Sequence, residues 1–161
     1  MTQQSAAVGV LGLASICSLL LQAGGEVKTG RRQPAGDSRA FSVNAPAMTW
    51  RRMEPQMGSA SPERALLYED PVTHASRFMV RVPKNFHIPR HWHTANETHT
   101  VISGTFIMEA QGARVALRAG GFNFTPGSTP HEAWTPPAEG ALLFVTVDGP
   151  YDLRIAAPGR K

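Results

Sequence analysis

The sequence predicts a single all-β domain, either a closed barrel or a double-sheet jelly roll, behind an N-terminal segment of different composition. About ten short runs of strand-forming residues follow position 48, and Gly- and Pro-containing turn signals separate them. No run after residue 25 has the length and periodicity of an amphipathic helix. Many short strands at this spacing are typical of barrels and jelly rolls rather than of helical or parallel-sheet folds.

The chain begins with an apolar stretch from Ala6 to Leu21, followed by small residues. Its length predicts that residues 1–23 are a secretory signal peptide, with a buried N-terminal apolar helix as the alternative, and no stable membrane span in the mature chain. Residues 24–47 are rich in Gly, Arg, Pro and Ser, which indicates a flexible linker. We therefore expect residues 48–161 to form the domain, in a secreted or periplasmic protein, with a cytoplasmic protein as the alternative.

The expected strands follow one another closely along the domain. They cover residues 49–53, 65–69, 77–82, 99–103, 105–109, 114–118, 121–125, 132–135, 141–147 and 151–155. Ser103-Gly104 is interpreted as a turn between two of these strands. The run 141–147, ALLFVTV, is apolar at successive positions, which predicts a strand buried on both faces.

The net charge of +4 does not indicate a nucleic-acid-binding protein. Residues 1–46 carry four basic and two acidic side chains, which leaves twelve basic against ten acidic residues in the rest of the chain. These basic residues are scattered, whereas a nucleic-acid binder gathers Lys and Arg on one face or helix. We expect a small molecule as the partner instead.

The segment HWHTANETHTVISG, residues 91–104, gathers three histidines and a glutamate within nine positions. Side chains two apart on a strand point the same way, so His91 and His93 share one side, and Glu97 can reach the same space after a short turn. Neutral imidazoles and a carboxylate suit Fe, Mn, Co, Ni, Cu or Zn better than Ca or Mg. Cys17 is the single cysteine, which excludes a cysteine-based zinc site. By itself, the histidine pair is also compatible with a polar turn.

A further ligand candidate is His131, in the segment FTPGSTPHEAW. Pro130 holds the chain extended just before this histidine, and a rigid turn of this kind can direct one imidazole toward a neighbouring strand. The alternative for His131 alone is a surface turn residue. Its conjunction with the earlier cluster on an all-β background favours the ligand interpretation.

The remaining histidines receive other interpretations. His99 shares the parity of Glu97 and is expected to face the interior, where it could hydrogen-bond a ligand residue, compete for the metal or act as a general base. We name His99 and Glu97 as the candidate catalytic residues, with a satisfied interior histidine as the alternative for His99. His74 and His87 are interpreted as surface or loop residues.

These segments resemble the two sequence motifs of the cupin superfamily, and the whole chain is similar to its small single-domain members. The first motif reads His91-x-His93-x3-Glu97-x6-Gly104. The second reads Gly120-x5-Pro126-x4-His131. Three positions depart from the family pattern, all in turns or at strand ends: Asn85 and Thr135 replace a usual glycine and asparagine, and Gly127 stands one residue early.

The resemblance covers roughly residues 48–155 and implies a jelly-roll barrel, or double-stranded β-helix, whose mouth holds one divalent transition metal. It implies that the metal ligands are His91, His93, Glu97 and His131. In an octahedral shell, four protein ligands leave about two positions for substrate, water or O₂, which is typical of a catalytic centre. Small cupins commonly pair through their outer strands, so a homodimer is also expected.

Three functions agree with this sequence. The preferred one is a metal-dependent oxidoreductase of the dioxygenase type, with a small-molecule substrate, O₂ or both at a 3-His-1-Glu centre. The second is a Lewis-acid isomerase, epimerase or lyase acting on a sugar-like substrate. The third is a non-catalytic domain that binds a metal or small ligand. Several apolar residues near the motifs are expected to form either the core or pocket walls: Phe106, Met108, Phe122, Phe124 and Trp134.

Overall fold

The computed structural model describes residues 40–156. The predicted segment 1–23 and most of the predicted linker lie outside this range. The described elements are η1 (Ala45–Ala47), β1 (Arg51–Arg52), η2 (Pro55–Ala60), β2 (Glu63–Glu69), β3 (Ser76–Val82), β4 (His87–Trp92), β5 (Glu97–Ala110), β6 (Ala113–Arg118), β7 (Phe122–Thr125), β8 (His131–Trp134), β9 (Ala141–Val147) and β10 (Arg154–Ile155). Within residues 40–156, no helix combines the length and apolar character needed to cross a membrane.

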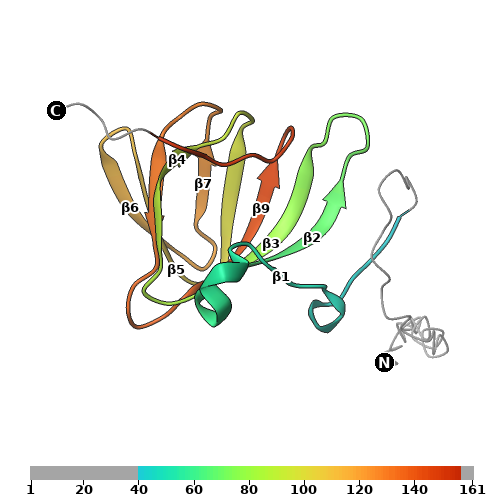
Figure 1. Cartoon of the computed structure of the whole chain (residues 1–161), viewed down its shortest axis with the longest axis horizontal. Coiled ribbons are helices and arrows are strands. Elements are labelled where there is room, and N and C mark those ends of the chain that lie inside the picture. The colour runs from blue at the N-terminus through green and yellow to red at the C-terminus, as the bar shows by residue number, and fades with distance from the viewer. Residues whose placement is uncertain (1–39, 157–161) are drawn as a thin grey trace, which may run out of the picture.

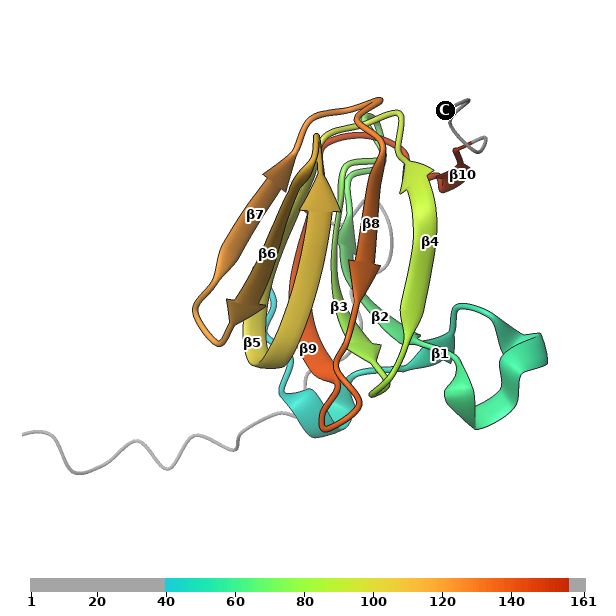
Figure 2. The same ribbon diagram turned by 90° about the vertical axis from the view of Figure 1, so that its left-hand side faces the viewer.

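The strands form two antiparallel sheets that curl toward each other and share strand β5 (Figures 1 and 2). In sheet A, the order is β1-β2-β3-β9-β5-β7. In sheet B, the order is β6-β5-β8-β4-β10. The prediction of an all-β, jelly-roll fold is confirmed. The two sheets face each other across an interior space, which is where the candidate site lies.

Strand β5 corrects the prediction of two strands separated by a turn at Ser103-Gly104. The chain runs on as one strand of fourteen residues, whose first half pairs with β9 in sheet A and whose second half pairs with β6 and β8 in sheet B. Gly104 has φ +78°, and a Cβ there would collide with the carbonyl oxygen of Gly140. The glycine therefore bends the strand from one sheet into the other instead of reversing it.

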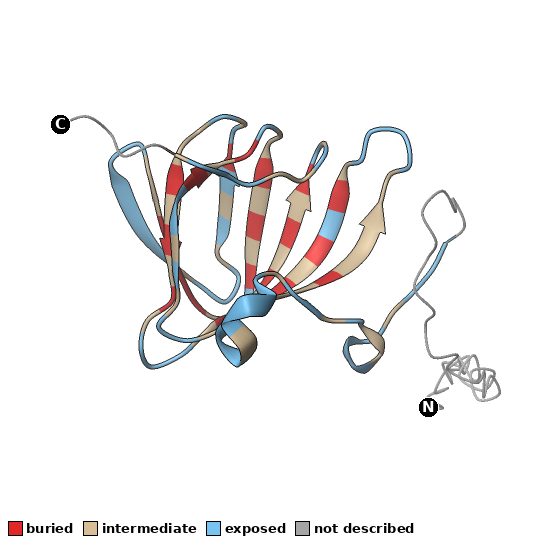
Figure 3. Cartoon of the chain, viewed as in Figure 1, coloured by how far each residue is buried: buried red, intermediate tan, exposed pale blue. Residues whose placement is uncertain are grey.

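The inward faces of both sheets supply the hydrophobic core, visible as alternating buried bands along the strands (Figure 3). Strand β9 shows the alternation clearly: Leu143, Val145 and Val147 are buried, whereas the residues between them are half-buried. The prediction that this strand is buried on both faces is therefore wrong for its outer side. A sheet that packs on one face only gives this pattern.

Four of the five apolar residues near the motifs are either buried or exposed according to the side of the strand on which they lie. Phe106 and Met108 are buried in the core, whereas Phe122 and Phe124 are 59% and 54% exposed. The two exposed rings belong to β7, where Asn123 and Thr125 occupy the inward positions. The expectation that Phe122 and Phe124 form core or pocket walls is therefore wrong, because aromatic content alone does not reveal which way a four-residue strand faces.

Candidate metal centre

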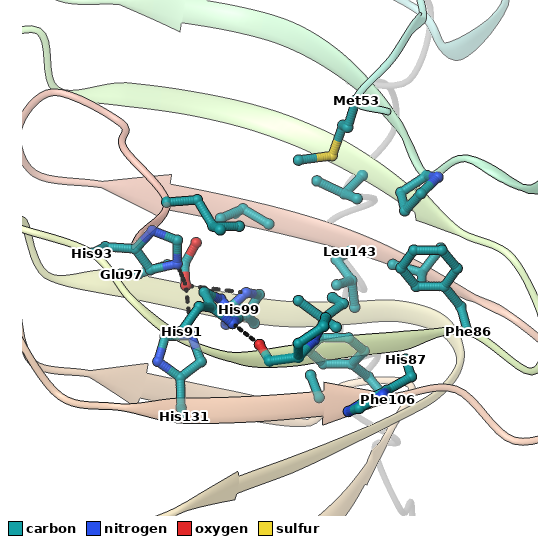
Figure 4. A pocket seen from close by; sticks show the side chains of 18 of the residues that line it. Met53, Phe86, His87, His91, His93, Glu97, His99, Phe106, His131 and Leu143 are labelled. Atoms are coloured by element: carbon teal, nitrogen blue, oxygen red, sulfur yellow. Dashed lines mark hydrogen bonds and ion pairs between the residues drawn. The ribbon is translucent and has the colours of Figure 1, made fainter. Parts of the chain in front are cut away.

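The structure brings the predicted ligand residues together at one end of the interior space (Figure 4). His91 lies near the end of β4, directly opposite His131 at the start of β8. His93 follows β4, and Glu97 opens β5. All four side chains are buried. One nitrogen from each of the three histidines lies within 4.8 Å of the others, an arrangement that can hold a metal ion.

Each of these imidazoles is fixed through its Nδ1 atom by a backbone carbonyl. The Nδ1 atom of His91 lies 2.8 Å from the oxygen of Pro89, and that of His131 lies 3.0 Å from the oxygen of Thr129. The Nδ1 atom of His93 bonds to the carbonyl of Asp152. A carbonyl oxygen can only accept, so Nδ1 carries the hydrogen in all three rings. In the neutral ring, the Nε2 lone pair is then free, which is the usual arrangement of metal-binding histidines.

The carboxylate of Glu97 lies beside this group. Its Oε2 atom lies 3.2 Å from Nε2 of His93 and 3.7 Å from Nε2 of His131. The same oxygen is buried and has no hydrogen-bond partner. An unpaired buried carboxylate oxygen is costly, because it has lost water without gaining a donor. The three imidazoles therefore fit a divalent transition metal. Glu97 lies beside two of them, where a bound cation would satisfy its oxygen.

The electrostatics of the cluster favour the protonation states that a metal requires. Burial, followed by repulsion from His131, lowers the pKa of His91 to about 4. Burial also lowers the pKa of His131. For Glu97, burial acts to raise the pKa, but the neighbouring imidazoles of His99 and His93 outweigh it and lower the pKa to about 2. At neutral pH, His91 and His131 are thus neutral and Glu97 is ionised, as metal ligands must be.

His93 behaves differently from its neighbours. Burial acts to lower its pKa, but the adjacent Glu97 carboxylate and the carbonyl of Asp152 raise it above the ordinary value. A metal bound at this point would replace the proton that Glu97 attracts to the ring. Metal and proton therefore compete for His93 more strongly than for His91.

His99 is a fifth buried member of the cluster. It lies two residues beyond Glu97, on the same face of β5. Its Nε2 atom lies 3.5 Å from Oε2 of Glu97, and its Nδ1 atom lies 3.3 Å from Oδ1 of Asn123. The same amide oxygen accepts a hydrogen bond from the hydroxyl of Thr125 at 2.9 Å. The interior position expected for His99 is confirmed, and a polar pair on β7 supports it there.

The two other histidines lie outside the cluster. His74 is exposed in the turn between β2 and β3, where it bonds to Glu69. His87 belongs to β4 instead of a loop, and its ring stacks on Trp134 at a centroid distance of 5.2 Å. Its Nε2 atom lies 2.6 Å from Oε1 of Glu132. Although His87 is exposed, it also lines the cavity that adjoins the histidine cluster.

A cavity of about 420 Å³ extends from the histidine cluster between the two sheets. Its walls are mainly apolar and include Phe78, Phe106 and Leu143, and Met53 lies at the end away from the histidines (Figure 4). Outside the five clustered residues, the polar lining residues among those described are Glu54, His87 and Tyr151. No lysine or arginine within residues 40–156 lines this cavity.

Sequence reasoning missed the C-terminal contribution to this site. Tyr151 lines the cavity, with its ring centroid 5.4 Å from that of His93, and Asp152 supplies the carbonyl that fixes the same histidine. The run YDLRI suggests a strand and carries no local signal of a contact with a residue nearly sixty positions earlier. Only the tertiary structure reveals this part of the site.

Comparisons with known proteins agree with this fold. Residues 78–150 match the family model described as a cupin domain. No curated protein matches the sequence. The crystal structures of the DMSP lyases RdDddP and RnDddQII share 21% identity and a TM-score of 0.58, over 70% of this chain and 64% of that chain. The chain thus spans a little under two thirds of that relative.

Two further solved structures cover more of their own length. DMSP lyase DddQ from Ruegeria pomeroyi DSS-3 shares 17% identity with a TM-score of 0.58, over 83% of this chain and 85% of that chain. KdgF from Halomonas sp. shares 18% identity with a TM-score of 0.54, over 65% of this chain and 92% of that chain. At these identities, the likeness concerns the fold.

Proposed function

Because the chain belongs to the cupin superfamily, we propose that it is a metal-dependent enzyme acting on a small molecule, and specifically an oxidoreductase of the dioxygenase type. One observation carries the proposal. Three imidazoles meet within metal-binding distance at one end of a cavity whose walls are mainly apolar, and beside them lies the buried Oε2 atom of Glu97, which has no hydrogen-bond partner.

In this proposal, His91, His93, Glu97 and His131 hold one divalent transition metal. When bound, the metal supplies redox chemistry and polarises the oxygen atoms of a substrate. The protein fixes the ligands beforehand, since each imidazole is already oriented by a carbonyl and Glu97 is already ionised. Preorganised ligands of this kind need little rearrangement on binding.

The composition of the cavity supports a substrate with an apolar body and its oxygen atoms gathered at one end. The volume of about 420 Å³ is in the range of small-molecule sites. A sugar carries hydroxyl groups around its whole ring, and beyond the histidine cluster this wall offers them few polar partners, which is unfavourable. A phosphorylated molecule would find no lysine or arginine among the described lining residues. Both points favour the oxidoreductase over an enzyme that acts on sugars.

His99 has the position of a proton acceptor in this reaction. If the Oδ1 atom of Asn123 accepts from Nδ1, the Nε2 atom keeps a lone pair on the side of Glu97 and the cavity. A group at that position can remove a proton from a substrate whose oxygen atoms approach the cluster. The same observation favours a second candidate function, a Lewis-acid lyase or isomerase, because such reactions need a base beside the metal.

Metal analysis and oxygen uptake test the proposal. Protein purified without added metal should contain about one equivalent of a transition metal. The double variant His91→Ala, His131→Ala should lose it, whereas the control His74→Ala, which removes an exposed imidazole, should retain it. The Fe- or Ni-loaded protein should then consume O₂ with a member of a panel of catechol-, flavonol- and diketone-type compounds. Full metal content in the double variant would refute the site, and isomerised or cleaved product without O₂ uptake would favour the second candidate.

A further inference from the structure

Residues 150–156, which follow β9, lie beside the histidine cluster. We call this segment the C-terminal strap. Its strand β10 pairs with β4 so that Ile155 is opposite His91. The backbone N–H of Ala156 also donates to the carbonyl of Arg90 at 2.9 Å. Tyr151, Leu153 and Ile155 line the cavity. The strap therefore forms part of the wall beside the candidate ligands.

The three histidines differ in where their supporting carbonyl comes from. His91 and His131 each use a carbonyl two residues earlier in their own segment, Pro89 and Thr129. Each of these two rings is therefore supported by its own segment. His93 uses the carbonyl of Asp152, which is 59 positions away in the sequence. Of the three rings, His93 alone depends on the strap for this contact.

The side chain of Asp152 attaches the strap to the residue after His93. Its Oδ1 atom accepts the backbone N–H of Thr94 at 2.8 Å, and its Oδ2 atom accepts the hydroxyl of Thr94 at 2.7 Å. Oδ2 also accepts from Nε of Arg154 at 2.7 Å. The two hydrogen bonds from Thr94 hold the backbone of Asp152, and with it the carbonyl used by His93, against the end of β4, whereas the bond from Arg154 braces the carboxylate within the strap.

Tyr151 limits the same ring from one side. Its ring stacks on that of His93 at 5.4 Å with an interplanar angle of 29°. Tyr151 is in turn packed edge-on against Phe78 at 5.3 Å, and the guanidinium of Arg64 lies 5.4 Å from its ring centroid. The imidazole of His93 is therefore restrained both in its plane and at its Nδ1 atom.

We propose that Asp152 is a positioning residue for His93: its carboxylate binds the strap to Thr94, and the bound strap presents the carbonyl and the aromatic ring that orient the imidazole toward Glu97. This inference rests on the proposed metal site. Loss of the Asp152 carboxylate detaches this part of the strap from Thr94 and loosens the carbonyl that orients His93, while β10 stays paired with β4 and the other two histidines keep their local supports. Loss of an outer partner of a ligating histidine typically lowers metal affinity by about 10- to 100-fold.

Three variants separate this role from a general contribution to folding. Asp152→Ala removes all three acceptor contacts, whereas Asp152→Asn keeps an oxygen for the Thr94 N–H but points an amide toward Arg154. Thr94→Val removes only the hydroxyl donor and serves as a milder second probe. Asp70→Ala is the matched control, because the Asp70 carboxylate accepts two backbone N–H groups in the β2–β3 turn, away from the cavity.

The experiment measures Co²⁺ and Zn²⁺ dissociation constants by chelator competition, the visible absorption of the Co²⁺-loaded full chain, and the thermal midpoint of the metal-free chain. We expect about 10- to 100-fold weaker binding and a changed Co²⁺ spectrum for Asp152→Ala, smaller changes in the same direction for Asp152→Asn and Thr94→Val, and wild-type binding for Asp70→Ala. If the Asp152→Ala or the Thr94→Val variant bound both ions with wild-type affinity and gave an unchanged Co²⁺ spectrum, the positioning role would be overturned. The proposed metal site would remain intact. A wild-type chain that binds neither ion would instead refute the proposed metal function itself.

Discussion

Mild acid should destabilise the metal-free protein through His91. Burial and the neighbouring His131 lower the pKa of His91 from the ordinary 6.5 to about 4 in the folded chain. Below pH 6.5, the unfolded chain therefore binds a proton at His91 that the folded protein excludes. Where the unfolded state binds more protons than the folded state, the free energy of unfolding decreases as the pH is lowered. The effect is absent above pH 6.5 and complete near pH 4.

The two pKa values give the size of this effect. Their difference corresponds to about 3 kcal/mol of unfolding free energy at 1.36 kcal/mol per pH unit. His131 adds to the loss, since burial lowers its pKa as well. His93 has a raised pKa, so it contributes stability that is present below pH 6.5 and lost as pH rises through its folded pKa. The unfolding free energy falls by a further amount of about 3 kcal/mol between pH 4.5 and about 2. In this interval Glu97 is protonated in the unfolded chain but still ionised in the folded chain.

Urea unfolding in the presence of a chelator, followed between about pH 7 and pH 4.5, measures the effect directly. The wild-type chain should lose a large part of its stability over this interval, because domains have only about 5–15 kcal/mol in total. The variant His91→Gln has no titrating group at this position and should show a distinctly shallower pH dependence. Equal slopes for the two proteins would refute the link between His91 burial and acid sensitivity.

Three further outcomes can be checked independently. A transition metal at about 100 times its dissociation constant should raise the unfolding free energy by about 2.7 kcal/mol in differential scanning calorimetry, and the variant His91→Ala, His131→Ala should not respond. Gly104→Ala should lower the urea midpoint by the equivalent of at least about 1–2 kcal/mol. The reason is that residue 104 has φ +78° and that a Cβ there would collide with the carbonyl of Gly140. An unchanged midpoint would contradict the bend in β5. His99→Gln should keep one equivalent of metal but slow turnover about 100-fold or more, whereas loss of the metal would make His99 a ligand.

The candidate cluster could be predicted because its signal is local and periodic. Alternation along strands places His91 and His93 on one side, and Glu97 and His99 on one side of β5, and all four side chains are buried as expected. A fixed motif spacing then relates them to the distant His131. The structure confirms the jelly-roll class and the close approach of the three histidines, whereas their roles as ligands stay a prediction.

What could not be predicted depends on long-range geometry. Whether Gly104 reverses or bends a strand is decided by the neighbouring Gly140 carbonyl, which local sequence does not place. Asn85 shows the converse case, because it stands where a glycine is usual and adopts φ +54°, a left-handed conformation that asparagine tolerates. The strap contact between Asp152 and His93 has no local pattern at all. Pairings across many residues form through topology and packing, so composition and periodicity do not reveal them.

The four candidate ligands come from both sheets of the fold. His91 and His131 come from sheet B, whereas Glu97 belongs to the half of β5 that pairs in sheet A. The fold therefore brings a buried, unpaired carboxylate oxygen from one sheet against imidazoles from the other, at a cost in desolvation. A metal held by all four would join the two sheets at this end of the barrel, so its binding free energy would add to the stability of the fold. His93, whose support comes from the strap, would extend the same link to the C-terminal segment.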